Sequence, residues 1–214
     1  MNFKKSIWSM GLLAFIAASC VEHEVIPPPK PEVELECSFT ATIKNDLDEW
    51  DYDLVEQVDG FFCDPTQAKI LNPSPQPSFV TYFASIRSQD QLDYIQVKLG
   101  RLQFNADMEP DPSVEAFENF CMSNVNPNFA SEGNGGVEVV FRDNTNQVWT
   151  SNPASQQPQS FVFSALNLES DDDNDYMKFI ATFTCYLYNN LDNPPAGDSI
   201  LIENGIYRGY FRHK

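Results

Sequence analysis

The chain has 214 residues, and its 31 Asp and Glu against 13 Lys and Arg give it a formal net charge of −18 at pH 7. So acidic a protein repels phosphate backbones, which argues against nucleic acid as a partner. The length is sufficient for one domain with a buried core.

The first twenty residues have the pattern of a secretory leader. Two lysines at positions 4 and 5 precede an apolar run over residues 7–18, and small residues then lead to Cys20. The run is too short to span a bilayer as a helix of the mature protein, so we expect it to be removed.

The segment Ala17–Cys20 resembles the lipobox of bacterial lipoproteins, in which processing lipidates the cysteine and cuts before it. Ala17 stands where leucine is usual in that motif. The resemblance implies a signal peptide over residues 1–19 and a lipid anchor on Cys20. The alternative is an ordinary cleavable signal that happens to precede a cysteine.

Residues 20–36 are rich in proline and glutamate. This composition favours an extended, polyproline-like spacer that holds the domain off the membrane, with a reach on the order of 50 Å at about 3.1 Å per residue. Acidic residues soon after Cys20 resemble the surface-export signals of some Bacteroidota-type lipoproteins. The sequence leaves open whether the domain faces the periplasm or the cell surface.

The domain expected over residues 37–214 begins with short strands. Residues 37–43 alternate between apolar and polar side chains, and a second strand is expected near residues 52–58. Asp59-Gly60 is a hairpin signal before residues 61–63.

Two longer strands follow. Residues 78–87 are apolar on both faces, which predicts a central strand that is covered on both sides. In residues 94–104 the apolar positions change face at Gly100. This predicts a β-bulge near Gly100 and Arg101, because one extra residue changes the face without ending the strand.

One short helix is predicted after these strands. Asp111 can cap it, Pro112 suits its first position, and apolar residues recur at helical spacing from Val114 to Cys121. We expect two to three turns that close an open end of the β structure.

The clearest hairpin spans residues 137–149. An alternating strand ends near Phe141, residues 143–146 supply a polar turn, and the chain returns at Trp149. Together with a later strand at residues 160–163, this segment resembles one in uncharacterised Bacteroidota-type envelope lipoproteins, and a weaker resemblance covers most of the domain. The resemblance implies a cell-envelope address and a β-rich fold, and it implies no activity.

The stretch Met177–Leu187 is the one around which we expect the fold to be organised. Its side chains alternate, and only Ile180 breaks the pattern. One side carries Met177, Phe179, Ala181, Phe183, Cys185 and Leu187, whereas the other carries Lys178, Thr182, Thr184 and Tyr186. So long a strand needs neighbours on both edges and a second layer over its apolar face.

The last strands are expected at residues 199–202 and 206–211, with Asn204-Gly205 as a two-residue turn or a bulge between them. Together the patterns predict an all-β fold. We expect an antiparallel β-sandwich or flattened barrel of about nine or ten strands with one short helix.

The two histidines give no sign of catalysis. His23 lies in the spacer and His213 is one residue from the end, so we expect neither in a packed site. The domain therefore lacks the histidine that a Ser-His-Asp, Cys-His or His-based zinc site requires. Carboxylate-based catalysis stays open, but no enzymatic activity and no cofactor are predicted.

Alternate carboxylates at Asp171, Asp173 and Asp175 match the start of a calcium loop. The loop glycine and the distal glutamate of an EF-hand are missing, because Tyr176 and Thr182 stand there. We interpret the stretch as a solvated hairpin tip and predict no metal site.

Exposed aromatic side chains could stack on sugar rings, as in carbohydrate-binding β-sandwiches. The candidates are Trp50, Tyr94, Trp149, Tyr186 and Tyr188. Core packing or cross-strand pairing is the alternative for each of them. Tyr186 and Tyr188, on the more polar face of the organising stretch, are the best candidates to face a ligand.

Four cysteines remain once Cys20 is lipidated, and three pairings are possible in an oxidising compartment. Cys37 and Cys185 lie in predicted strands, whereas Cys63 and Cys121 lie in a loop and in the helix. We predict a Cys63–Cys121 bridge that ties the loop to the helix, and free buried thiols are the alternative.

These observations predict a non-enzymatic lipoprotein of the outer membrane, anchored through Cys20, whose β domain is a binding or assembly module for an unknown ligand. An envelope protein or a glycan is the expected partner besides the membrane itself. The alternative is a carbohydrate-binding or carboxylate-based, carbohydrate-active surface protein.

Overall fold

The computed structural model describes residues 30–45, 49–55, 60–89, 93–130, 135–155, 157–189 and 198–214, except for the side chains of Trp50 and Val55. The predicted signal peptide and the lipidation site at Cys20 lie outside these residues. Among the residues described, no helix has the length and apolar character needed to cross a membrane.

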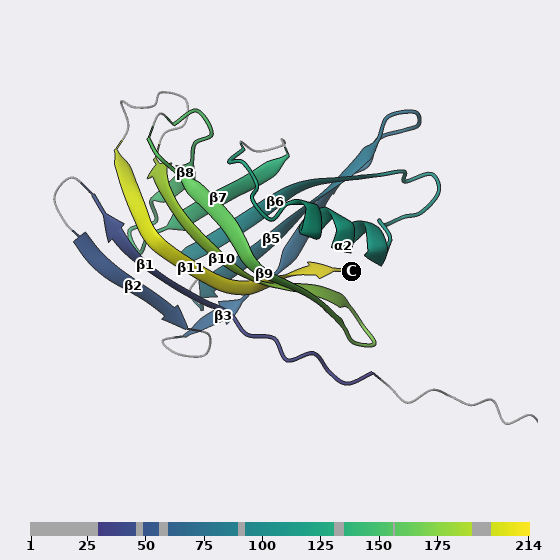
Figure 1. The fold of residues 1–214 in the computed structure, drawn as a ribbon, viewed down its shortest axis with the longest axis horizontal. Helices are drawn as coiled ribbons and strands as arrows, with labels where there is room; N and C mark the ends of the chain where they lie inside the picture. Colours follow the sequence, from purple (N-terminus) through teal and green to yellow (C-terminus); the bar gives the residue numbers. More distant parts are fainter. Residues whose placement is uncertain are drawn as a thin grey trace, which may run out of the picture. The chain divides into compact units, whose positions relative to one another are not determined.

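The described strands form one antiparallel sheet, accompanied by one short helix (Figure 1). The elements are β1 (Ser38–Lys44), β2 (Glu49–Val55), β3 (Phe61–Cys63), β4 (Thr66–Ile70), β5 (Ser78–Ser88), β6 (Tyr94–Phe104), α2 (Val114–Ser123), β7 (Gly136–Arg142), β8 (Val148–Ser151), β9 (Ser160–Ser170), β10 (Asp175–Tyr188) and β11 (Ser199–His213). The order across the sheet is β2-β1-β11-β10-β8-β7-β6-β5-β3, with β4 paired to β5 and β9 paired to β10.

The predicted all-β antiparallel fold with one short helix is confirmed. The described residues contain eleven strands rather than nine or ten. Sequence reasoning missed β4 because its last three residues are exposed and it has no alternating apolar face.

The predicted organising stretch is a central strand. Within β10, all six positions of the apolar face from Met177 to Leu187 are buried, while Thr182 on the other face is exposed. β11 pairs along one edge of β10, and β8 and β9 share the other edge. The face assignment made from the alternation is therefore confirmed.

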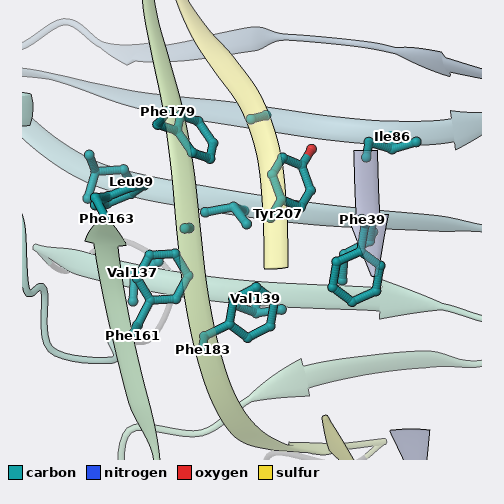
Figure 2. Close-up of a cluster of buried hydrophobic side chains, with 14 of the residues drawn as sticks. Phe39, Ile86, Leu99, Val137, Val139, Phe161, Phe163, Phe179, Phe183 and Tyr207 are labelled. Carbon is teal, nitrogen blue, oxygen red and sulfur yellow. The ribbon is translucent and has the colours of Figure 1, made fainter. Parts of the chain in front are cut away.

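The sheet bends so that its two halves face each other across a common core. β9, β10, β11 and β1 form one layer, and β5, β6 and β7 form the other (Figure 1). Figure 2 shows Phe179 and Phe183 of β10 in the same cluster as Leu99 of β6 and Val139 of β7. The sheet does not close, because β2 and β3 stand at opposite ends of the strand order. The arrangement fits a β-sandwich or a flattened barrel.

A disulfide joins the strands near the two open ends of the sheet. Cys37, directly before β1, is bonded to Cys63 at the end of β3. The predicted Cys63–Cys121 bridge is therefore wrong, and Cys121 and Cys185 are buried free thiols. Cys121 lies on the core-facing side of α2, where it packs as a small apolar side chain.

The bulge predicted from the change of apolar face in β6 is confirmed. In the β5–β6 pair, Gly100 and Arg101 together stand opposite the single residue Thr81. The extra residue returns the apolar side chains to the core, so that Leu99 and Leu102 are both buried.

The expected turn or bulge near the chain end is a bulge, and β11 continues through it. Glu203 and Asn204 of β11 together oppose Thr184 of β10. Gly205 follows, and a Cβ atom at this position would lie 3.0 Å from the ring of Phe183. Glycine is therefore needed where the backbone of β11 passes close to that aromatic side chain.

Helix α2 lies near its predicted place but begins with a different cap. The hydroxyl oxygen of Ser113 accepts the backbone N–H of Ala116 at 3.2 Å. The predicted cap Asp111 is wrong, because its carboxylate forms an ion pair with Lys69 of β4. The helix packs on β6, β9 and β10, and the buried Phe117 lies on its core-facing side.

Candidate functional site

A pocket of about 350 Å³ lies at the end of the domain where β7 turns into β8. Its lining combines aromatic, acidic, amide and aliphatic side chains from five separate parts of the chain: Tyr52, Phe141 and Trp149, Asp93 and Asp143, Asn45 and Asn144, and Ile200. Two other described pockets, of about 380 and 340 Å³, are more open grooves on the outer face of β9, β10 and β11. The first pocket is therefore the best candidate for a ligand site.

The Asp143 carboxylate holds the turn between β7 and β8. Its Oδ1 atom accepts the backbone N–H groups of Thr145 and Gln147 at 2.9 and 3.0 Å, and the hydroxyl of Thr145 at 2.6 Å. Its Oδ2 atom accepts the indole Nε1–H of Trp149 at 3.1 Å. The predicted hairpin is confirmed, and both oxygens of Asp143 are engaged within it.

The two carboxylates give the pocket its charge, because its phenol is neutral at pH 7. Burial, the largest single influence, raises the pKa of Asp143, but hydrogen bonds from Thr145, Trp149 and Gln147 together hold that pKa below its usual value. Burial first, and then the charges of Asp93 and Asp143, raise the pKa of Tyr52 far above its ordinary value. At neutral pH the Tyr52 hydroxyl therefore stays protonated, whereas Asp143 is ionised.

Tyr52 connects the pocket to the aromatic core. Its ring meets Phe141 edge to face, with ring centroids 5.4 Å apart, and lies 6.2 Å from Phe39. Phe141 and Trp149 are buried, so they form a fixed back wall. Tyr52 is half-buried and lines the pocket, so part of this residue is open to a ligand.

Asp93 differs from Asp143 in the hydrogen bonding of its carboxylate. The backbone carbonyl of Asp93 accepts the N–H of Ser88 at 3.0 Å, which fixes the residue just before β6. Its side chain makes no hydrogen bond or ion pair with another residue that the structure describes. No described lining residue is Lys, Arg or His. The pocket therefore combines negative charge with one available carboxylate.

The two tyrosines predicted to face a ligand lie outside this pocket. Tyr188 is only 7% exposed, and its hydroxyl lies 3.0 Å from the Oγ atom of Ser155, so the prediction for Tyr188 is wrong. The pairing of the end of β10 with β8 brings Tyr188 under the loop that follows β8. Tyr186 is half-buried on the outer face of β10 and lines none of the three described pockets.

The other aromatic candidates have different surroundings. Trp149 lines the pocket, Tyr94 packs under the guanidinium of Arg87 at 4.8 Å, and the side chain of Trp50 is outside the described structure. Tyr52 was not among the candidates. It could have been found as a large aromatic residue that alternates with exposed aspartates along a strand.

His213 is buried, contrary to the expectation for a residue so near the chain end. β11 continues to this residue, which pairs with Asp175 of β10. Its ring stacks on Phe117 with centroids 5.0 Å apart, and its Nδ1 atom lies 3.2 Å from the hydroxyl of Tyr82. None of the three described pockets is lined by His213, so we assign it a packing role.

The carboxylates of the acidic hairpin hold a turn. The Oδ1 atom of Asp171 accepts the backbone N–H groups of Asp173 and Asn174 at 3.0 and 2.8 Å. The carboxylate of Asp175 accepts the hydroxyl of Ser170 at 2.6 Å. Within the described parts of the chain, no group of three or more His, Cys, Asp and Glu residues could hold a metal ion.

Comparison with protein-family models, with curated proteins and with solved structures finds no match to this chain. Its function must therefore be inferred from its own residues.

Proposed function

We propose that this chain is an outer-membrane lipoprotein, anchored through Cys20, whose β domain is a non-enzymatic binding module with its ligand site between Tyr52, Asp93 and Trp149. The lipobox-like segment Ala17–Cys20 supports the anchor. One observation carries the binding site: a fixed aromatic wall faces an available carboxylate in a pocket of about 350 Å³, a volume that suits a small molecule.

The lowered pKa and the hydrogen bonds of Asp143 favour binding over acid–base catalysis. A carboxylate pair that cleaves glycosidic bonds includes one member with a raised pKa, which donates a proton to the leaving group. The pKa of Asp143 is lowered, and both of its oxygens already accept hydrogen bonds. Asp143 is therefore unsuited to donate a proton, and with both oxygens held in the turn it is also poorly placed to act as the base or nucleophile of such a pair.

The place where the spacer meets the domain also supports a binding role. Lys178, near the start of β10, donates a hydrogen bond from Nζ to the backbone carbonyl of Glu34 at 3.0 Å. Ile200 of the pocket pairs with Leu187 near the other end of β10. About nine residues of an extended strand separate these two points, which is about 30 Å. Glu34, which lies in the expected spacer, thus contacts the domain far from the pocket.

The anchor is tested by replacing Cys20 with Ser. This variant should lose acyl labelling and leave the membrane fraction, because cleavage of the leader removes the remaining apolar segment. Labelling with radioactive palmitate, followed by membrane fractionation of the bacterial host, measures both effects. Cys185→Ala, which removes a buried free thiol of β10, is the control and should keep both label and location. Acylated, membrane-bound Cys20→Ser protein would contradict the anchor.

The binding site is tested by comparing two half-buried tyrosines. Tyr52→Ala should abolish ligand binding, whereas Tyr186→Ala on the outer face of β10 should retain it. The mature full chain is titrated with small amines, alcohols and sugars while the indole N–H signal of Trp149 is followed by NMR. If binding depends on Tyr186 and not on Tyr52, or if no compound moves the Trp149 signal, the proposed site is wrong.

A further inference from the structure

We infer that the ligand of this pocket carries a primary ammonium group, which binds between the carboxylate of Asp93 and the ring of Tyr52. This inference rests on the proposed function of the pocket and names the chemical class of its ligand.

The charges that line the pocket have one sign. Asp93 and Asp143 both line it, and the described lining contains no Lys, Arg or His. The chain as a whole has a formal net charge of −18. Aromatic walls lower the local dielectric and strengthen the field of these carboxylates. Anionic ligands are therefore repelled, and a small cation is attracted.

The two carboxylates serve different purposes. Asp143 contributes charge, but its oxygens already accept hydrogen bonds from Thr145, Gln147 and Trp149. The half-buried Asp93 carboxylate has no partner among the described residues. A partly buried carboxylate without a donor is costly, and an N–H···O hydrogen bond from a charged ligand removes that cost. Asp93 is therefore the group that the ligand contacts.

The ring of Tyr52 supplies the second contact. Cations bind favourably over the faces of aromatic rings. Of the three aromatic residues that line the pocket, Tyr52 is half-buried, whereas Phe141 and Trp149 are buried. A primary ammonium can lie on the ring of Tyr52 while it donates to Asp93, and its alkyl chain can lie on the apolar wall. A quaternary ammonium has no N–H to donate, and a neutral sugar gains nothing from the negative field.

The test uses two probes of matched size, n-butylammonium and the neutral n-butanol, and a larger neutral sugar, methyl β-glucoside. The mature full chain is purified with its anchor in a non-ionic detergent that contains no sugar. The indole N–H signal of Trp149 then reports dissociation constants. We expect n-butylammonium to bind about tenfold more tightly than n-butanol, with an affinity that falls as the salt concentration rises.

Two variants with the same change of charge separate a local contact from the general field. Asp93→Asn should weaken n-butylammonium binding about tenfold or more, because it keeps the shape of the side chain but removes its charge. Asp53→Asn changes an exposed carboxylate of β2 that does not line the pocket, and it should leave the affinity within about a factor of two. Thermal unfolding of both variants shows that each is folded.

Three results would overturn the inference: equal or tighter binding of a neutral probe, equal weakening by the two variants, or no binding of n-butylammonium. The proposed function would survive these results if a neutral probe bound and Tyr52→Ala abolished its binding. If Tyr52→Ala changed the binding of none of the probes, the proposed function and the inference about its ligand would both be wrong.

Discussion

The carboxylate of Asp143 holds one wall of the pocket in place. Asp143 closes the turn between β7 and β8 through Thr145 and Gln147, and it fixes the indole of Trp149 through its other oxygen. The turn was predictable because its residues are neighbours in the sequence. The pocket was not, because Tyr52 of β2 and Asp93, just before β6, come from parts of the chain that only the folded sheet brings together.

His213 is a residue whose burial has a consequence for stability. Burial, the largest influence, lowers its pKa from the ordinary 6.5, and the charge of Lys214 acts in the same direction. The carboxylates of Asp175 and Asp111 and the backbone carbonyl of Pro112 oppose this shift without reversing it. The unfolded chain therefore takes up a proton at this histidine at a higher pH than the folded chain does. Stability from the neutral ring is present above about pH 6.5 and is lost as the pH falls.

We predict that His213→Phe will make the stability of the domain less dependent on pH between 7 and 5. Phenylalanine keeps a ring against Phe117 but cannot take up a proton. Urea unfolding at pH 7, 6 and 5 measures the change for the wild type and for the variant, and titration of the carboxylates cancels in the comparison. Loss of the contact with Tyr82 lowers the stability of the variant at every pH. The change of unfolding free energy with pH, rather than its absolute value, is therefore the readout. Identical slopes would contradict the prediction.

At the scale of elements, β10 joins aromatic side chains of β1 and β9 in the core. Phe183 is buried and stacks on Phe39 of β1 and Phe161 of β9, with ring centroids 6.0 and 5.3 Å apart. Figure 2 shows these three rings in the core cluster. Thr182, the preceding residue, is exposed on the outer face.

We predict that Phe183→Ala will cost about 3–5 kcal/mol of unfolding free energy, because it leaves a cavity between two rings. Thr182→Ala should cost less than about 1 kcal/mol, since its side chain is exposed. Urea unfolding of the mature chain measures both values. The larger loss is a substantial part of the total stability of a typical domain, about 5–15 kcal/mol. A larger cost for Thr182→Ala would mean that the faces of β10 are inverted.

The elements differ in how far the sequence predicts them. β10 and the bulge at Gly100 and Arg101 were predictable because both appear as local periodicity of apolar residues. The cap of α2 could not be predicted, because Asp and Ser are both common cap residues. Asp111 forms an ion pair with Lys69, which is distant in the sequence, and Ser113 caps the helix. β4 was missed because pairing with β5, rather than burial of its own side chains, defines it.

At the scale of the whole molecule, the open ends of the sheet are the feature that sequence reasoning could not anticipate. Nothing in the local pattern says that β1 and β3, which do not pair, come close enough to share a disulfide. Four cysteines allow three pairings, and only the curvature of the sheet selects among them. The Cys37–Cys63 bridge holds together a fold that has no ladder of hydrogen bonds between its terminal strands β2 and β3.

We predict that removing this bridge will cost about 3 kcal/mol, because the cross-link restricts the unfolded chain over a loop of about 26 residues. Urea unfolding without reductant should show this loss for the Cys37→Ala/Cys63→Ala double variant. Adding reductant should bring the wild type to nearly the same stability and should leave the double variant unchanged, since its two remaining domain cysteines are buried free thiols. Peptide mapping without reduction gives the connectivity directly. A fragment that joins Cys63 to Cys121, or a wild type insensitive to reductant, would mean that the open ends of the sheet are held by packing alone.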